Sequence, residues 1–281
     1  MEIRIPLIIG GLCLIFCACK EQQNKTAESN PQWKLGVQSW TFRMFTLQET
    51  ISKADSAKIR YIEAFWDQPL GEGTTDSFGS GMSAESRAKL KSWLNAKGIS
   101  IRAMGVINPR TREEWIKAFE LAQEFHVSYI SSEPIKNQWD MIDTLAGEYS
   151  VKVAIHDHPI PNPYWHPDSV EAAIVGHKNL GACADVGHWA RSGLDPIDCL
   201  RKLDGHIVGV HLKDIKTFGN RLAEDTVVSF GIIDFPAIFK ELKRQNFTGM
   251  FSIEHESNWM NSLPDVILTR EYFEKETAKV Q

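Results

Sequence analysis

Short apolar stretches recur along the chain from residue 35 to residue 254, and amphipathic stretches with helical spacing separate them. The apolar stretches are rich in residues that favour β-strands. They cover residues 35–40, 61–65, 99–106, 127–132, 151–156, 180–185, 207–212 and 249–254. This alternation is typical of parallel strands joined by crossover helices.

Start and stop signals support the helices between these stretches. Thr111 and Glu114 have the spacing of a capping box, in which two side chains satisfy free backbone N–H groups at a helix start. Asp195 before Pro196 predicts an N-cap followed by a helix-starting proline. Gly98 is a matching stop, because glycine readily takes the conformation that ends a helix.

Eight strand and helix pairs fit into residues 34–281, and no linker interrupts them. Their number and length predict a single-domain (β/α)8 barrel. The alternative is an open doubly wound sheet, which would need a glycine-rich phosphate turn after the first strand. Residues 38–43 contain no glycine. We therefore predict the closed barrel.

The first 33 residues do not follow this pattern. Arg4 precedes an apolar run from Ile5 to Phe16, which is typical of a secretion signal and short for a bilayer span. The tetrapeptide that ends at Cys19 resembles a bacterial lipobox, so we expect a signal peptide over residues 1–19, acylation of Cys19 and a polar tether over residues 20–33. An uncleaved anchor or ordinary signal peptidase cleavage are the alternatives. The prediction is a protein held to the membrane of the bacterial cell envelope by lipid, facing the periplasm or the cell surface.

Composition and charge narrow the choice of partners. With 43% hydrophobic and 24% charged residues, the chain has the composition of a folded protein. Its formal net charge of -5 provides no basic field that would attract phosphate backbones. We expect no nucleic-acid partner, and a small neutral or weakly charged ligand instead. The sequence leaves open whether the protein forms an oligomer.

Only two cysteines follow the predicted signal, Cys183 in a strand-like run and Cys199 in a helix-like run. Two cysteines do not make a disulfide framework. We expect them to be unpaired core residues, although export to an oxidising compartment leaves a disulfide possible.

Polar residues gather where the predicted strands end, which is the reactive face of a (β/α)8 barrel. The residues concerned are Glu133, His156, His158, Asp185, His188, His211, Lys213, Glu254 and Glu256. A single strand-end histidine is usually just hydrogen-bonded, but here five successive strands carry such residues. Imidazole and carboxylate are ligands that suit Zn²⁺, Mn²⁺ or Co²⁺. We therefore predict one site for a divalent metal ion.

The motifs Asp185-Val-Gly-His188, Val210-His-Leu-Lys-Asp214 and Ile253-Glu254 resemble the xylose isomerase-like TIM barrel superfamily, the sugar phosphate isomerase/epimerase group. The resemblance extends from about residue 34 to residue 272. It implies that Asp185, His211 and Glu254 bind a divalent metal and that His188 contacts the substrate.

The fourth ligand is the point where the sequence departs from the family. Family members typically place a glutamate at the end of the fifth strand, where this sequence has His156. Either His156 replaces that carboxylate, or Glu133 on the neighbouring strand reaches the metal. We expect His156, and Glu133 is the second candidate.

The resemblance implies an isomerase or epimerase that abstracts a proton next to a sugar carbonyl and passes through an enediolate. Glu254 would serve one face of the sugar, and Glu133, His156 or His158 the other. The missing strand-five glutamate leaves room for a second reaction, elimination on a 3-keto-glycoside. Lys213 should point inward beside His211 and could stabilise an alkoxide, or form an ordinary salt bridge. A third possibility is a non-catalytic lipoprotein that binds sugar.

Aromatic residues are frequent near the predicted strand ends, where their flat apolar faces would suit a sugar ring. They are Trp40, Trp66, Tyr164, Trp165, Trp189 and Trp259. We expect about half of them to be packing residues.

Export favours unphosphorylated sugars or sugar derivatives, because phosphorylated sugars are mostly cytosolic.

Overall fold

The computed structural model describes residues 1–2 and 33–280. Eight parallel strands close into a barrel in the order β1, β10, β7, β6, β5, β4, β3, β2. Their bounds are β1 (Lys34–Gln38), β2 (Tyr61–Ala64), β3 (Ser100–Met104), β4 (Tyr129–Ser132), β5 (Lys152–His156), β6 (Leu180–Asp185), β7 (Ile207–Leu212) and β10 (Met250–Ile253). The predicted (β/α)8 barrel is confirmed.

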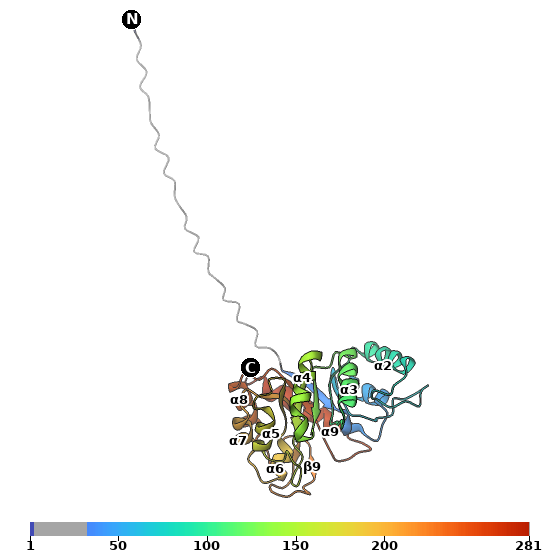
Figure 1. Ribbon diagram of the computed structural model, residues 1–281. Helices are drawn as coiled ribbons and strands as arrows, with labels where there is room; N and C mark the ends of the chain where they lie inside the picture. Colours follow the sequence, from blue (N-terminus) through green and yellow to red (C-terminus); the bar gives the residue numbers. More distant parts are fainter. Residues whose placement is uncertain (3–32, 281) are drawn as a thin grey trace. The chain divides into compact units, whose positions relative to one another are not determined.

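Helices connect successive strands and lie around the barrel (Figure 1). The α-helices are α1 (Leu47–Ser56), α2 (Ala84–Lys97), α3 (Arg112–Glu124), α4 (Trp139–Tyr149), α5 (Pro167–Ile174), α6 (Val186–Arg191), α7 (Pro196–Lys202), α8 (Phe235–Arg244) and α9 (Leu263–Thr277). Two 3-10 helices, η1 (Ser39–Phe42) and η2 (Lys136–Gln138), and a small sheet of β8 (Asp214–Ile215) and β9 (Asp225–Thr226) complete the described secondary structure.

The predicted signal peptide and its lipidation site Cys19 lie outside the described residues, as does nearly all of the tether. Within the described ranges, no helix combines the length and the apolar character that a membrane crossing requires. The envelope location therefore stays a prediction.

The first strand is shorter than predicted, because its end is capped. The side chain of Gln38 accepts a hydrogen bond from the backbone N–H of Trp40, and this starts the 3-10 helix η1 at Ser39. Asp195 and Thr111 cap their helices as expected, and Gly98 ends α2 in the left-handed conformation. The predicted capping box is only half formed, because the carboxylate of Glu114 accepts a hydrogen bond from the backbone N–H of Arg110 and not from that of Thr111.

The register of the barrel determines which side chains share its interior. Residues that pair across parallel strands point to the same face. Asp185 pairs with His211, and His211 pairs with Ser252 on the next strand. Gln38 pairs with Glu63 on the other side of the barrel. These five side chains therefore point inward near the carboxyl ends of their strands.

A small apolar cluster fills the middle of the barrel, separate from the main core between strands and helices. It includes Ala103, Tyr129, Cys183 and Met250. Cys183 and Cys199 are both buried and free, so the expectation of unpaired cysteines is confirmed. The cluster separates the two mouths of the barrel.

Candidate active site

Four side chains meet at the carboxyl ends of neighbouring strands. His156 ends β5, Asp185 ends β6, His211 lies in β7, and Glu254 directly follows β10. One ligand atom from each lies within 4.8 Å of all the others. Three of the four residues are completely inaccessible to solvent, and Glu254 is 7% exposed. The structure thus brings together the four predicted metal ligands.

Two of these ligand atoms have no hydrogen-bond partner among the described residues. They are Nε2 of His156 and Oδ2 of Asp185, which lie 3.8 Å apart, and Oδ2 has only an ion pair with Nζ of Lys213 at 3.2 Å. Burying a polar atom without a partner is costly, so native structures rarely leave one unexplained. Imidazole and carboxylate in this arrangement fit a divalent ion such as Zn²⁺, Mn²⁺ or Co²⁺. A metal ion would satisfy both atoms at once.

Glu63 in β2 is a site residue that the sequence analysis missed. Its carboxylate is fully buried and accepts hydrogen bonds from Ser131 and Ser252, and it lies 3.1 Å from Nε2 of His211. Burial would raise the pKa of Glu63, but the interactions with His211 and the two serines outweigh it and lower this pKa to about 2. An ionised Glu63 favours the proton of His211 on Nε2, and Nδ1 then faces the other ligands, 2.7 Å from Oε2 of Glu254 and 3.7 Å from Oδ2 of Asp185. The sequence feature that could have identified Glu63 is its position as a carboxylate in the otherwise apolar strand β2.

The geometry favours His156 over Glu133 as the fourth ligand. Glu133 contacts Nδ1 of His158, accepts a hydrogen bond from Asn162, and lies 3.5 Å from Nδ1 of His156. Burial would raise the pKa of Glu133, but hydrogen bonds with His156 and His158 hold it well below its ordinary value. Glu133 therefore orients two imidazole rings, and Nε2 of His156 faces the other ligands.

Lys213 is a fully buried cation beside the four ligands. Its Nζ lies 3.2 Å from Oδ2 of Asp185, 3.2 Å from Oε2 of Glu254 and 3.0 Å from Oε2 of Glu256. Burial would lower the pKa of Lys213, but Asp185, Glu254 and Glu256 together raise it well above its ordinary value. The predicted inward orientation is correct, and the ammonium is held by three carboxylates at the centre of the site. Gly187 makes room for its side chain, because a Cβ there would lie 2.6 Å from Cγ of Lys213.

Arg191 and Glu256 form a second layer behind Lys213. Arg191 is ion-paired with Asp225, and its other terminal nitrogen lies 3.1 Å from Oε2 of Glu256. Burial would raise the pKa of Glu256, but Lys213 and Arg191 outweigh this effect and lower it to about 2. Glu256 is therefore a carboxylate that links two cations. The sequence analysis did not identify Arg191 and Asp225 as site residues, because neither lies at the end of a barrel strand. Arg191 is the last residue of α6, and Asp225 lies in the short strand β9.

His188 lies between the two cations. Its Nε2 is 3.0 Å from Nζ of Lys213, and its Nδ1 is 3.2 Å from a terminal nitrogen of Arg191. Burial is the main cause that lowers the pKa of His188 well below its ordinary value. His188 is thus a neutral ring, and its centroid lies 4.9 Å from that of His158, which is 44% exposed. The two rings form one wall of the site.

The four tryptophans predicted to bind substrate lie in different environments. Trp40 donates a hydrogen bond from Nε1 to Glu256, which places it beside the site. Trp165 is half-buried next to His166, and Trp66 packs edge-on against Phe78. Trp189 is fully buried in the main core, which corrects its expected rim position to a packing role.

The xylose isomerase-like TIM barrel family matches residues 51–275 of this chain. The chain belongs to this family. An inosose dehydratase of Clostridium botulinum (strain Alaska E43 / Type E3) is 31% identical over 163 residues, which cover 52% of this chain and 54% of that protein. The chain thus matches about half the length of this relative.

Two solved structures extend the comparison. An uncharacterised protein from Parabacteroides distasonis ATCC 8503 is 36% identical, with a TM-score of 0.70, over 86% of this chain and 98% of that protein. The IolI protein with a binding zinc atom has a TM-score of 0.68 at 19% identity, over 88% of this chain and 99% of that protein. The second likeness concerns the fold alone.

Proposed function

We propose that the protein is a metal-dependent carbon–oxygen lyase that acts on an unphosphorylated keto-sugar, keto-polyol or 3-keto-glycoside. The observation that carries this proposal is the group of four buried ligands with an imidazole and an ammonium close by. A solvent-accessible imidazole, His158, and a buried ammonium, Lys213, both lie next to His188 beside these ligands. An elimination needs such a pair, since one group takes a proton and the other gives one.

His156, Asp185, His211 and Glu254 would hold the ion. When bound, a divalent ion supplies positive charge that polarises a carbonyl and makes the adjacent C–H group more acidic. The carboxylate of Glu63, 3.1 Å from Nε2 of His211, would keep this imidazole in the orientation that binds the ion.

His158 is the proposed base. Its Nδ1 contacts Glu133, so Nε2 carries the lone pair that would take the proton from the carbon next to the carbonyl. The electron pair of that C–H bond forms the new carbon–carbon double bond, and the bond to the oxygen on the next carbon breaks. Lys213 would donate a proton to the departing oxygen, which leaves as water or as the hydroxyl of an aglycone. Glu133 then stabilises the protonated imidazole of His158.

The name of the Clostridium relative points in the same direction, because a dehydratase removes water from its substrate. The match covers about half of that protein, so we take from it the reaction class and not the substrate. A sugar isomerase or epimerase is the second candidate, and Glu254 supports it, because this residue could move a proton on one face of the sugar. A symmetric epimerase would need a second carboxylate opposite Glu254, and the family's glutamate at the end of the fifth strand is replaced here by His156.

Isotope exchange separates the two reactions. The metal-loaded protein is incubated in deuterium oxide with an inosose, with a 3-keto-glycoside and with an ordinary ketose. We expect an unsaturated product and released water or aglycone from one of the first two. Deuterium incorporation without bond cleavage would support the epimerase, and binding without any exchange would support a non-catalytic sugar-binding protein.

We also propose that the mature protein is attached to the cell envelope through acylated Cys19. The support is the sequence pattern of residues 1–19. Labelling cells with an alkyne-modified fatty acid should mark the wild-type protein and not a Cys19→Ala variant. Equal labelling of both proteins would contradict the proposal.

A further inference from the structure

A cavity lies at the mouth of the barrel opposite the candidate active site, where the strands begin. Its volume is about 720 Å³, which is in the range of cavities that hold small ligands. Four basic residues line it, Lys34, Arg102, Lys152 and Lys178. None of its described lining residues is an aspartate or a glutamate. Nothing in the proposed lyase reaction uses this cavity.

Three of the cations come from alternate strands and face the barrel axis. Lys34 of β1 pairs in register with Met250, and Lys152 of β5 pairs with Tyr129, and both partners belong to the cluster inside the barrel. Arg102 is the extra residue of a register shift between β2 and β3. Alternate strands of a (β/α)8 barrel normally supply one layer of bulky apolar side chains. Here that layer consists largely of positive charges.

The polar contacts of these cations within the described chain go to uncharged groups. Nζ of Lys152 donates to the backbone carbonyl of Lys178 at 2.9 Å. The guanidinium of Arg102 donates to Oγ of Ser128 at 2.8 Å and to the carbonyl of His126 at 3.3 Å. Like charges that face one opening repel one another, and an anion in that opening would relieve the repulsion.

We propose that this basal cavity, lined by Lys34, Arg102, Lys152 and Lys178, binds a phosphate-bearing ligand. Lysine and arginine are the side chains that recognise phosphate, and arginine does so through a planar fork of donors. The phosphate can belong to a soluble ester or to the headgroup of an anionic phospholipid. Both sources share the same chemistry, and the chain enters the barrel at this mouth through Lys34.

Calorimetric titration of the full-length protein at low salt tests the proposal. One arm uses inorganic phosphate and glycerol 3-phosphate, and the other uses dihexanoyl phosphatidylglycerol below its micelle concentration, with dihexanoyl phosphatidylcholine as its uncharged control. Binding in the first arm identifies a soluble ester as ligand, and binding in the second identifies a lipid headgroup. In either case we expect the double variant Lys34→Gln/Lys152→Gln to bind at least tenfold more weakly.

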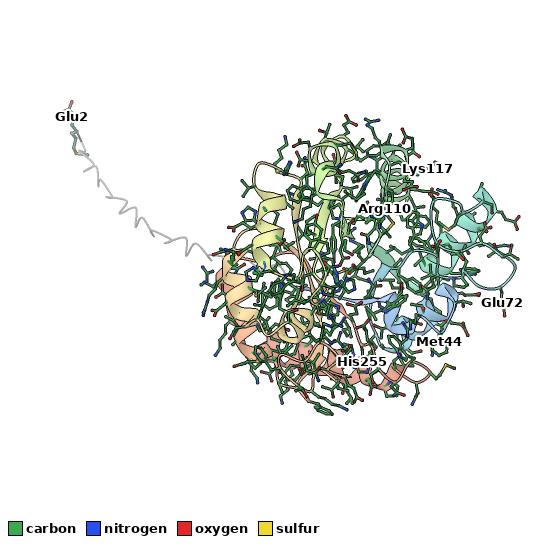
Figure 2. All side chains as sticks on the ribbon, turned by 60° about the horizontal axis from the view of Figure 1, so that its bottom comes forward. Glu2, Met44, Glu72, Arg110, Lys117 and His255 are labelled. Carbon is green, nitrogen blue, oxygen red and sulfur yellow. The ribbon has the colours of Figure 1, made fainter. Side chains whose placement is uncertain are left out.

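The control is Lys117→Gln, which removes one positive charge from an exposed position on α3 (Figure 2), and Lys117 is not among the residues that line the cavity. It should bind like the wild type. Absence of binding in both arms, or equal affinity of the wild type and the double variant, would overturn the proposal.

A second readout does not depend on the double variant folding. In the wild type, acetylation of Lys34 and Lys152, followed by mass spectrometry, should slow at least threefold when the binding ligand is present. Acetylation of Lys117 in the same sample should stay unchanged. Equal rates for all three lysines with and without ligand would also refute the site.

Discussion

At the scale of single residues, the site is built from pairs in which one side chain fixes another. Glu63 holds His211, and Glu133 holds His158 and His156. In both cases a carboxylate contacts one ring nitrogen, and the other ring nitrogen is the one that would bind the metal or accept a proton. Partners of this kind commonly account for tenfold to 100-fold in metal affinity.

The variant Glu63→Gln tests this arrangement. The neutral amide removes the charge that fixes the proton of His211, so we expect metal affinity to fall by roughly tenfold to 100-fold. Competition with a fluorescent chelator measures the change. The exposed Glu72→Gln, in the loop after β2, is the control and should keep wild-type affinity (Figure 2). Unchanged affinity in Glu63→Gln would refute the positioning role.

The proposed base has its own test. Replacing His158 with Gln removes the imidazole that takes the proton, so kcat should fall by roughly 100-fold to 10,000-fold. Metal content should stay at the wild-type level, since His158 is not among the four ligands. Glu133→Gln keeps the imidazole and should reduce kcat less. A His158→Gln enzyme with normal kcat would assign the base to another residue.

At the scale of elements, the positions of the strands were predictable and their lateral contacts were not. The strands 180–185 and 207–212 were predicted with the observed bounds, and the polar residues at their ends were therefore recognised. Glu63 was missed because it meets His211 across 148 positions of sequence. That contact depends on the closure of the barrel, and no local pattern in β2 reports it.

Helix α6 illustrates how an element is shaped by the site. Gly187 lies against Lys213, so Gly187→Ala would force the buried lysine to move. We expect this variant to lose about 1–3 kcal/mol in the free energy of unfolding, as overpacked sites do. Gly81→Ala is the matched control, because a Cβ there meets no atom within 4 Å. Urea denaturation of both variants measures the difference, and equal stability would show that α6 can shift without cost.

At the scale of the whole molecule, the barrel carries two separate polar mouths around an apolar middle. The carboxyl-end mouth gathers carboxylates and imidazoles, and the opposite mouth gathers lysine and arginine. The fold class could be predicted from the alternation of elements, because eight strand and helix pairs have few ways to pack. The charge of the basal cavity could not, since a register shift at Arg102 determines which side chains reach it.

Metal binding should also stabilise the whole molecule. An ion that binds only the folded chain adds about 4 kcal/mol to the free energy of unfolding at 1,000 times its Kd. Chelation should therefore lower Tm, and Zn²⁺, Mn²⁺ or Co²⁺ should restore it. The variant Asp185→Asn should show a much smaller response to the metal. An identical Tm of the wild type with and without metal would argue against the site.

The central claim is that one divalent ion is bound jointly by residues of four strands. Anomalous diffraction from crystals of the metal-loaded protein tests it most directly. The account predicts a single strong peak about 2.0–2.2 Å from Nε2 of His156, Nδ1 of His211 and oxygens of Asp185 and Glu254. A map without a peak between these four residues, in crystals grown with excess metal, would contradict it.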